Sequence, residues 1–239
     1  MNLETISLYS LAIASLPVLV VLIILIRWES NYWNTIYAMF RMVVQLLLVG
    51  YFLKYIFEAN QSYLILAVLS IMLIASSWIS LRTIKENKFK LFKYALISIT
   101  IGGGLTLILI TQVVLTLNPW FQPKFMIPIA GMIFANSMNS ISLASDRIYV
   151  EIQQTQNYEK ARFTAFTTSL IPITNSLFAV GLVSLPGMMT GQILSGVSPL
   201  IAVRYQIVVM FMLFGSAGMS SAIFLSLSKE IFTKKTEAT

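Results

Sequence analysis

The sequence contains no cysteine and no histidine. Without cysteine there is no disulfide and no thiolate site, and without histidine the chain lacks the commonest metal ligand and the usual proton shuttle. It also has no GxxxxGK[ST] phosphate loop and no grouping of carboxylates, or of Ser, His and Asp, that serves hydrolysis. We therefore expect a protein that is not an enzyme and has no cofactor of its own.

Charge is also scarce, because charged residues make up 10% of the chain, against about 25% in an ordinary soluble domain. Proton- and sodium-coupled carriers usually keep an acidic residue inside the membrane. Here all nine carboxylates lie outside the apolar runs or at their ends: Glu4, Glu29, Glu58, Glu86, Asp146, Glu151, Glu159, Glu230 and Glu237. If this chain transports a solute actively, we expect the energy to come from a separate polypeptide.

Hydrophobic residues make up 57% of the 239 positions and predict an all-α integral membrane protein, a polytopic helix bundle. A bilayer crossing needs about 20 residues. Seven apolar runs approach or exceed that length, at residues 6–26, 36–57, 63–81, 94–117, 126–144, 163–185 and 200–227. We expect one transmembrane domain over residues 1–239 and no soluble domain. Because the fifth run is only weakly apolar, six crossings with that run as a re-entrant segment are the alternative.

The basic residues predict the orientation, because cytoplasmic loops are enriched in lysine and arginine. The loop at residues 82–93 lies between the third and fourth runs and is the richest in them. Placing it in the cytoplasm puts twelve of the sixteen basic residues on that side: Arg27, Arg82, Lys85, Lys88, Lys90, Lys93, Arg147, Lys160, Arg162, Lys229, Lys234 and Lys235. The N-terminus is then outside and the C-terminus inside. The net charge of +7 thus reflects basic cytoplasmic loops rather than a nucleic-acid partner. We expect the protein in the plasma membrane.

Several polar residues lie inside the apolar runs, where each costs free energy and tends to face another helix or a cavity. Arg41 and Gln45 are four residues apart and share one helix face, although Arg41 can also extend to the cytoplasmic headgroups. Asn136 and Asn139 share a face of the fifth run, and Asn175 lies in the sixth. Each is a candidate for the solute path, with a hydrogen bond between helices as the plainer alternative.

The stretch GLVSLPGMMTGQI at residues 181–193 interrupts the apolar pattern. It combines a proline with several glycines yet keeps two methionines, which is unusual for a loop in water. Interrupted backbone at membrane depth is tolerated where protein buries it or where it lines a cavity, and it points to a transport site. A tight surface connection between two runs is the equally weighted alternative.

Three segments resemble a known family: IPIAGMIFANSMNS at 127–140, LIPITNSLFAVGLVSLPGMMTGQILSGVSPLIAVRYQIVVMFML at 170–213, and the weaker RMVVQLLLVGYFLKYIF at 41–57. They are similar to the FetB/YbbM family of membrane proteins. Its bacterial members are described as permease subunits of ABC transporters that export iron with a FetA-type ATPase, and its plant relatives are linked to aluminium tolerance. The resemblance implies two permease copies paired with two cytoplasmic ATPase subunits.

The same resemblance draws attention to the segment after the fifth run. Family members carry there a cytoplasmic helical hairpin with an E-x-x-x-x-LGATP motif, similar to the segment by which ABC permeases engage their ATPases. This chain has no LGATP between Glu151 and Thr164, and its loop is shorter. The residues that the resemblance implies for ATPase coupling are Arg147, Glu151, Glu159, Lys160 and Arg162.

An iron substrate meets a shortage of ligands, because ferrous iron favours imidazole, carboxylate and thiolate, and the apolar runs contain none of these. Met188 and Met189 are the candidate soft ligands, although methionine is also ordinary packing material. A weak metal path and an organic or chelated solute fit the sequence equally.

We therefore expect a homodimeric permease in the lipid bilayer that moves a metal or another small solute and is driven by a separate ATPase. The residues expected to shape its path are Arg41, Gln45, Asn136, Asn139, Asn175, Pro186, Gly187, Met188, Met189, Gly191 and Gln192. One alternative is a passive channel or uniporter without an ATPase. Another is a non-transporting subunit that uses the basic loop 82–93 as a docking or anionic-lipid surface.

Overall fold

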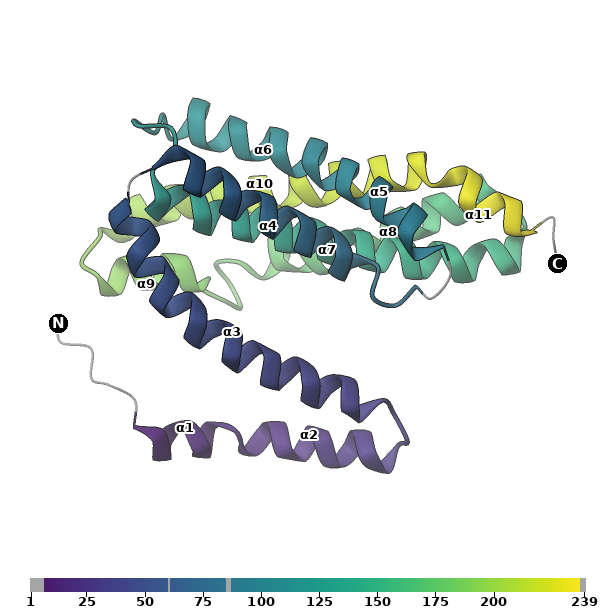
Figure 1. Cartoon of the computed structure of the whole chain (residues 1–239), viewed down its shortest axis with the longest axis horizontal. Coiled ribbons are helices and arrows are strands. Elements are labelled where there is room, and N and C mark those ends of the chain that lie inside the picture. Colours follow the sequence, from purple (N-terminus) through teal and green to yellow (C-terminus); the bar gives the residue numbers. More distant parts are fainter. Residues whose placement is uncertain (1–6, 60, 85–86, 237–239) are drawn as a thin grey trace. The chain divides into compact units, whose positions relative to one another are not determined.

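A computed structural model describes residues 7–59, 61–84 and 87–236, and every element within these ranges is a helix (Figure 1). The contacts divide the chain into two compact units, residues 1–59 and 60–239. Six helices in the described part are long and apolar enough to cross a membrane: Tyr9–Arg27, Tyr32–Phe57, Ser62–Ser80, Lys88–Val114, Pro123–Thr155 and Pro199–Leu227. The chain is thus a multi-pass helical membrane protein.

The first unit contains three helices, α1 (Leu8–Ala14), α2 (Leu16–Arg27) and α3 (Tyr32–Ala59). Ser15 joins α1 to α2, and its hydroxyl donates to the Ala12 carbonyl at 2.6 Å. Within α2 no residue is buried, although nearly every side chain is apolar. A helix that is apolar on all sides requires an apolar environment, so these exposed faces are typical of a membrane span.

The second unit is organised around α7 (Pro123–Thr155), which packs against α4 (Ser62–Ser80), α8 (Tyr158–Ala179) and α10 (Pro199–Leu227). Residues 133, 137, 141, 144 and 148 of α7 are completely buried. Their spacing of three or four residues places them on one face of the helix. This face holds serine and alanine beside isoleucine, so neighbouring helices approach closely.

The rest of the second unit covers this centre. The run at residues 88–114 is continuous but changes its winding: α5 (Lys88–Ser98), the π-helical turn η1 (Ile99–Gly103), α6 (Gly104–Ile108) and the π-helical turn η2 (Leu109–Val114). Two short helices complete the unit, α9 (Gly187–Leu194) before α10 and α11 (Lys229–Thr236) after it. Both α5 and η1 contact α10.

Six of the seven expected runs correspond to candidate spans, and the exception is the sixth run, residues 163–185. This run forms α8, which has 22 residues but is not among the six candidate spans. With 22 residues, α8 is long enough to cross a bilayer. It is not among the candidate spans because its threonines and serines, and the charged residues near its start, lower its hydropathy. The fifth run forms the 33-residue α7, a candidate span as expected, and not the re-entrant segment of the alternative.

Although α8 is less apolar, its 22 residues pack against the longer helices α7 and α10, which have 33 and 29 residues (Figure 1). At its start, the Tyr158 hydroxyl donates to the carbonyl of Leu225, near the end of α10. Beyond its end, the chain turns into α9, which packs against α10. The helix and the turn after it therefore connect the region near the end of α10 to α9, with Ala161, Ala165 and Ser169 buried along one face of α8.

One close approach between helices depends on a glycine. A Cβ atom at Gly102, in η1, would lie 2.6 Å from the hydroxyl and 2.7 Å from the backbone nitrogen of Ser220 in α10. Real Cβ contacts are longer, and the backbone nitrogen cannot rotate away. By contrast, a Cβ at Gly104 would meet nothing within 4 Å.

We predict that Gly102→Ala destabilises the protein by about 1–3 kcal/mol, because α10 must shift to admit the methyl group. The matched control, Gly104→Ala, is expected to be neutral or slightly stabilising, since alanine favours the helix. Thermal denaturation of the purified variants in detergent measures both effects. An unchanged midpoint for Gly102→Ala would contradict the close packing of η1 on α10.

Candidate functional site

Polar side chains of α7 hold α10 and α8 by hydrogen bonds. The side-chain amide of Asn136 donates to the Leu213 carbonyl at 2.6 Å. Ser220 donates to the Ser137 hydroxyl at 3.1 Å, and the Ser140 hydroxyl lies 3.2 Å from the Ala217 carbonyl. Asn136 thus links α7 to α10, and its part in a solute path stays a prediction.

The interrupted stretch between α8 and α10 forms an ordered corner. After α8 the chain makes a turn in which the Gly181 amide donates to the Ser184 carbonyl at 3.0 Å. Gly181 has a φ of 85° and Gly196 a φ of 92°, conformations that favour glycine. Between the two turns, residues 187–194 form α9, which begins directly after Pro186.

A cavity of about 200 Å³ lies at this corner. Its lining comes from the end of α8, the turn, α9 and α10: Leu177, Val180, Gly181, Leu185, Pro186, Met189, Val203, Gln206, Ile207, Met210 and Phe211. Among these side chains only that of Gln206 is polar. The corner thus forms a partly open, mainly apolar hollow at the surface of the second unit.

Two glutamine oxygens near the corner lack hydrogen-bond partners. Gln206, on α10, is 5% exposed, and its Oε1 is buried without a partner. Gln192, on α9, has the same property at its Oε1. A buried polar atom without a partner costs about 1–3 kcal/mol, so each such group in a native protein requires an explanation.

The structure brings only some of the expected path residues together. Pro186 and Met189 line the cavity, and Gln192 is on the helix that carries Met189. Five others do not line it: Asn136, Asn139, Asn175, Gly187 and Gly191. Of these, Asn139 and Asn175 are exposed side chains of α7 and α8. Arg41 and Gln45 belong to the first unit, where both are exposed on α3.

The two candidate metal ligands point in different directions. Met189 lines the cavity, whereas Met188 is 36% exposed and does not line it. Adjacent helix positions do not face each other, which explains the separation. Met210 of α10 lines the same cavity as Met189. Among the described residues, no group of three or more Asp and Glu side chains is placed to hold a metal ion.

The segment expected to engage an ATPase is a helical hairpin. α7 continues to Thr155, Gln156 and Asn157 form the turn, and α8 begins at Tyr158. The Asn157 side chain caps α8 by accepting from the Lys160 amide at 3.1 Å. Residues 147–162 are therefore the two helix ends and the turn between them, and their part in ATPase coupling stays a prediction.

Ion pairs stabilise this hairpin and join it to the C-terminal end of the chain. Arg147 pairs with Glu151 at 2.5 Å within α7, and Arg162 pairs with Glu159 at 2.5 Å within α8. Lys229 of α11 approaches Glu159 at 3.5 Å. Lys160 is exposed, so its ammonium group is open to solvent or a partner.

A groove of about 260 Å³ lies beside the hairpin, between α8 and α10. Phe163 and Phe166 give it an apolar wall, and Phe163 is 73% exposed. Glu159 and Arg162 also line it, so two of the expected coupling residues border an apolar surface. Such a surface is typical of a contact with another protein.

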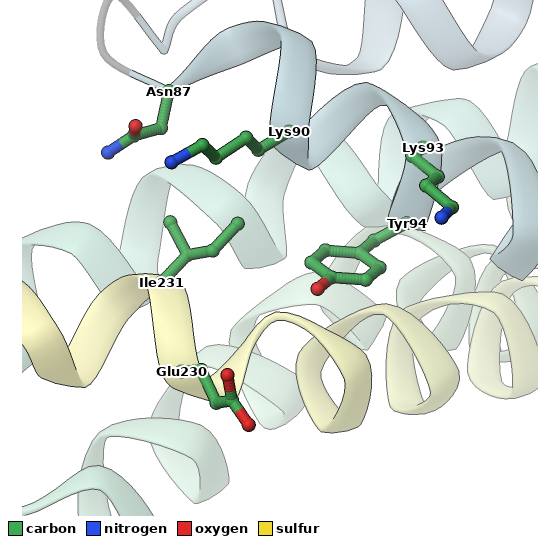
Figure 2. A pocket seen from close by; sticks show the side chains of 6 residues that line it. All are labelled: Asn87, Lys90, Lys93, Tyr94, Glu230 and Ile231. Atoms are coloured by element: carbon green, nitrogen blue, oxygen red, sulfur yellow. The ribbon is translucent and has the colours of Figure 1, made fainter.

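Basic residues of the loop at 82–93 line a second pocket at the same end, of about 350 Å³ (Figure 2). Figure 2 shows Lys90 extending toward Asn87 above Ile231, with Lys93 and Tyr94 further along α5 and Glu230 on α11. Lys88 is not part of this pocket, since its ammonium lies 4.4 Å from the centre of the Trp78 ring. Lys85 lies outside the described residues.

Sequence reasoning missed Gln206. It belongs to the RYQI sequence that contributed to the family resemblance, and it is a glutamine inside an apolar run. The signal that selected Gln45, a polar side chain too deep for the headgroups, applies to Gln206 as well. Its place in a cavity depends on α9 folding back onto α10, which the sequence pattern alone does not specify.

The comparisons place the chain among known sequences. A family model described as "Uncharacterised protein family (UPF0014)" matches residues 8–232. The chain is 35% identical to the "Probable iron export permease protein FetB" of Escherichia coli, over 93% of this chain and 91% of the relative. It is 35% identical to a UPF0014 membrane protein of Synechocystis over 80% of each chain. It is 33% identical to "Protein ALUMINUM SENSITIVE 3" of Arabidopsis thaliana, over 87% of this chain and 81% of the relative. No solved structure matches.

The buried Tyr158 hydroxyl at the hairpin yields a pH-dependent prediction. Burial raises the pKa of Tyr158 to about 12, and the neutral hydroxyl donates to the Leu225 carbonyl. In the unfolded chain tyrosine ionises near pH 10. Because the folded pKa is higher, the stability that the neutral hydroxyl contributes is complete below pH 10 and is lost as pH rises toward 12.

We predict that Tyr158→Phe lowers stability by about 1 kcal/mol at pH 8 through loss of this hydrogen bond. Between pH 10 and 12 the stability advantage of the wild type over the variant should shrink. Denaturation midpoints across this range provide the measurement, with the exposed Tyr37→Phe as control. A constant difference between wild type and Tyr158→Phe would contradict the prediction.

Proposed function

Because the chain belongs to the UPF0014 family, we propose that it is the membrane permease subunit of an ABC-type exporter, driven by a separate ATPase. The observation that carries the proposal is the similarity to a relative named as an iron export permease, which extends over 93% of this chain. The solute is a metal ion, such as iron, or another small molecule. Two copies of the chain form the functional transporter in the plasma membrane.

The arrangement of basic segments supports an orientation with the N-terminus outside and the C-terminus in the cytoplasm. Residues of α5 and α11 line one pocket, and α11 reaches the hairpin through Lys229 and Glu159. Three basic segments that the charge rule assigns to the cytoplasm therefore lie at one end of the second unit (Figure 1). This orientation requires an odd number of crossings, so α8 is proposed as the seventh, with hydroxyl groups such as that of Thr164 bonded to carbonyls within the helix.

The proposed mechanism is alternating access. The ATPase docks at the hairpin of residues 147–162 and at the adjacent groove, and its closure moves the start of α8. Because α8 is one continuous helix, the movement reaches the corner at its far end, where Pro186 and Met189 line the cavity. Pro172 within α8 and the Pro186–Gly187 step are the flexure points.

We predict that the tagged full-length protein, purified from its native membrane, brings with it a stoichiometric ABC ATPase that mass spectrometry identifies. Lys160→Glu should reduce this recovery at least severalfold, because an exposed cation of the hairpin becomes an anion. Lys124→Glu is the matched control, since Lys124 is an exposed lysine at the start of α7, the end opposite the hairpin. Equal ATPase recovery with both variants would contradict docking at the hairpin, and absence of any ATPase would contradict the permease proposal.

Flux in proteoliposomes separates the ATPase-driven exporter from a passive channel or uniporter. With Fe²⁺ as the solute and an enclosed iron-quenched dye as the reporter, we expect flux only when both the ATPase and ATP are present. Equal flux without nucleotide would identify a passive channel. Absence of flux in both conditions, with the ATPase bound, would contradict iron as the solute.

A further inference from the structure

We propose that the pocket between α5 and α11 binds the phosphate headgroup of an anionic phospholipid from the membrane leaflet at this end of the second unit. The bound lipid then bridges the start of α5 and the last described helix. The proposal goes beyond the proposed function and does not depend on it, because a lipid can bind here whether or not an ATPase docks at the hairpin.

An aromatic cluster sets the depth of this pocket in the membrane. The candidate span α4 has 19 residues, or about 28 Å, which matches a hydrocarbon core of about 30 Å. Its last turn, which carries Trp78, therefore lies at a membrane–water interface, where tryptophan is enriched. The centre of the Trp78 ring lies 5.6 Å from the ring centres of Phe89 and Phe92. The first turns of α5 are thus at headgroup level.

These turns of α5 carry an aromatic face and a basic face. Phe89 and Phe92 are three residues apart and share the face that contacts Trp78. Lys90 and Lys93 are also three residues apart, and both line the pocket toward α11 (Figure 2). Phe89 is 80% exposed beside Lys90, a combination typical of a helix turn that lies in the membrane interface. The contacts with Trp78 therefore hold the two lysines at the level of lipid phosphates.

The two lysines of the pocket have no protein counter-ion. Within residues 7–59, 61–84 and 87–236, the ion pairs are those of Arg147, Arg162 and Lys229, and neither Lys90 nor Lys93 takes part in one. The acid in the lining is Glu230, and Figure 2 shows its carboxylate pointing away from Lys90. Two ammonium groups against one carboxylate leave the lining with a net positive charge, which attracts an anion.

The rest of the lining suits a phosphate with its attached glycerol. The volume of about 350 Å³ equals that of roughly a dozen water molecules at about 30 Å³ each, which is enough for such a group. The amide of Asn87 and the hydroxyl of Tyr94 are neutral donors for phosphate oxygens. Ile231 points toward Lys90 and offers an apolar surface to the glycerol carbons (Figure 2). Because Lys90 and Lys93 are exposed, the pocket is open and the acyl chains can stay in the bilayer.

The first test measures lipid binding to the purified full-length protein by native mass spectrometry in detergent. The two lipids are phosphatidylglycerol and phosphatidylcholine with identical acyl chains, so that only the net charge of the headgroup differs in sign or absence. Soluble sn-glycerol 3-phosphate is the third ligand, and it separates a lipid site from a site for free phosphate esters. We expect phosphatidylglycerol to bind at least tenfold more tightly than either of the others.

The pocket variant combines Lys90→Gln with Lys93→Gln. It should bind phosphatidylglycerol roughly thirtyfold more weakly, which corresponds to about 1 kcal/mol for each lysine, and phosphatidylcholine with little change. The control variant combines Arg82→Gln with Lys160→Gln. It removes the same charge from two exposed residues outside the pocket and should keep the wild-type preference.

Asn87→Asp provides a second, independent variant, because it places a negative charge in the lining without changing the size of the side chain. It should weaken phosphatidylglycerol binding severalfold. Asn87 is the N-cap of α5, and aspartate is as good an N-cap as asparagine, so the fold is kept. Unchanged circular dichroism confirms this for the purified variant.

Hydrogen exchange in nanodiscs locates the site. Replacing phosphatidylcholine by phosphatidylglycerol should slow amide exchange in residues 87–94 and 229–233 and leave the turn at residues 155–158 unchanged. In the pocket variant this slowing should be lost.

The proposal is overturned if phosphatidylglycerol and phosphatidylcholine bind the wild type equally, or if the pocket and control variants lose affinity alike. It is also overturned if sn-glycerol 3-phosphate binds as tightly as the lipid, which would identify a site for soluble anions. Unchanged lipid binding by the pocket variant together with loss of a co-purifying protein would assign these lysines to an acidic protein surface and contradict the lipid site.

Discussion

Close contact between α7 and α10 is the interaction on which the rest of the second unit depends. Inside a bilayer, lipid tails are as apolar as leucine, so helices associate through tight packing of small residues and hydrogen bonds rather than through hydrophobic burial. The contact uses both, with serines 137, 140, 216 and 220 buried between the helices and Asn136 bonded to the Leu213 carbonyl. α4, α8 and η1 assemble on this pair, and η1 approaches so closely that Gly102 has no room for a side chain.

The polarity of α8 follows from its place beside this pair. Three of its hydroxyl groups bond to carbonyls one turn earlier, those of Thr164, Ser169 and Ser176. Such internal bonds satisfy hydroxyl groups without water. A helix of this kind can be less apolar than its neighbours and still lie among them. It can therefore join a charged hairpin at one end to an apolar cavity at the other.

The sequence predicted the helices well and the site only in part. Apolar length identified six of the described spans, because membrane thickness imposes that length on any sequence. Composition made residues 126–144 look weak as a span, although they form part of the candidate span α7, where Asn136 and Ser140 bond to other helices. Asn136 and Gln206 are both polar residues in apolar runs, yet one bonds to α10 and the other lines a cavity. That difference arises from the packing of helices far apart in sequence, and local pattern does not contain it.

Helix α11, the last described element, lies beside the hairpin. α11 contacts both α7 and α8, and Lys229 reaches Glu159 on one side and lies 5.5 Å from the centre of the Tyr158 ring on the other. A protein fused to the C-terminus is therefore tethered within a short distance of the surface where the ATPase is proposed to dock. In a gene fusion of permease and ATPase, this terminus would give the nucleotide-binding subunit a high effective concentration with only a short linker. For the same reason, a bulky reporter at this end would compete with the natural partner for space.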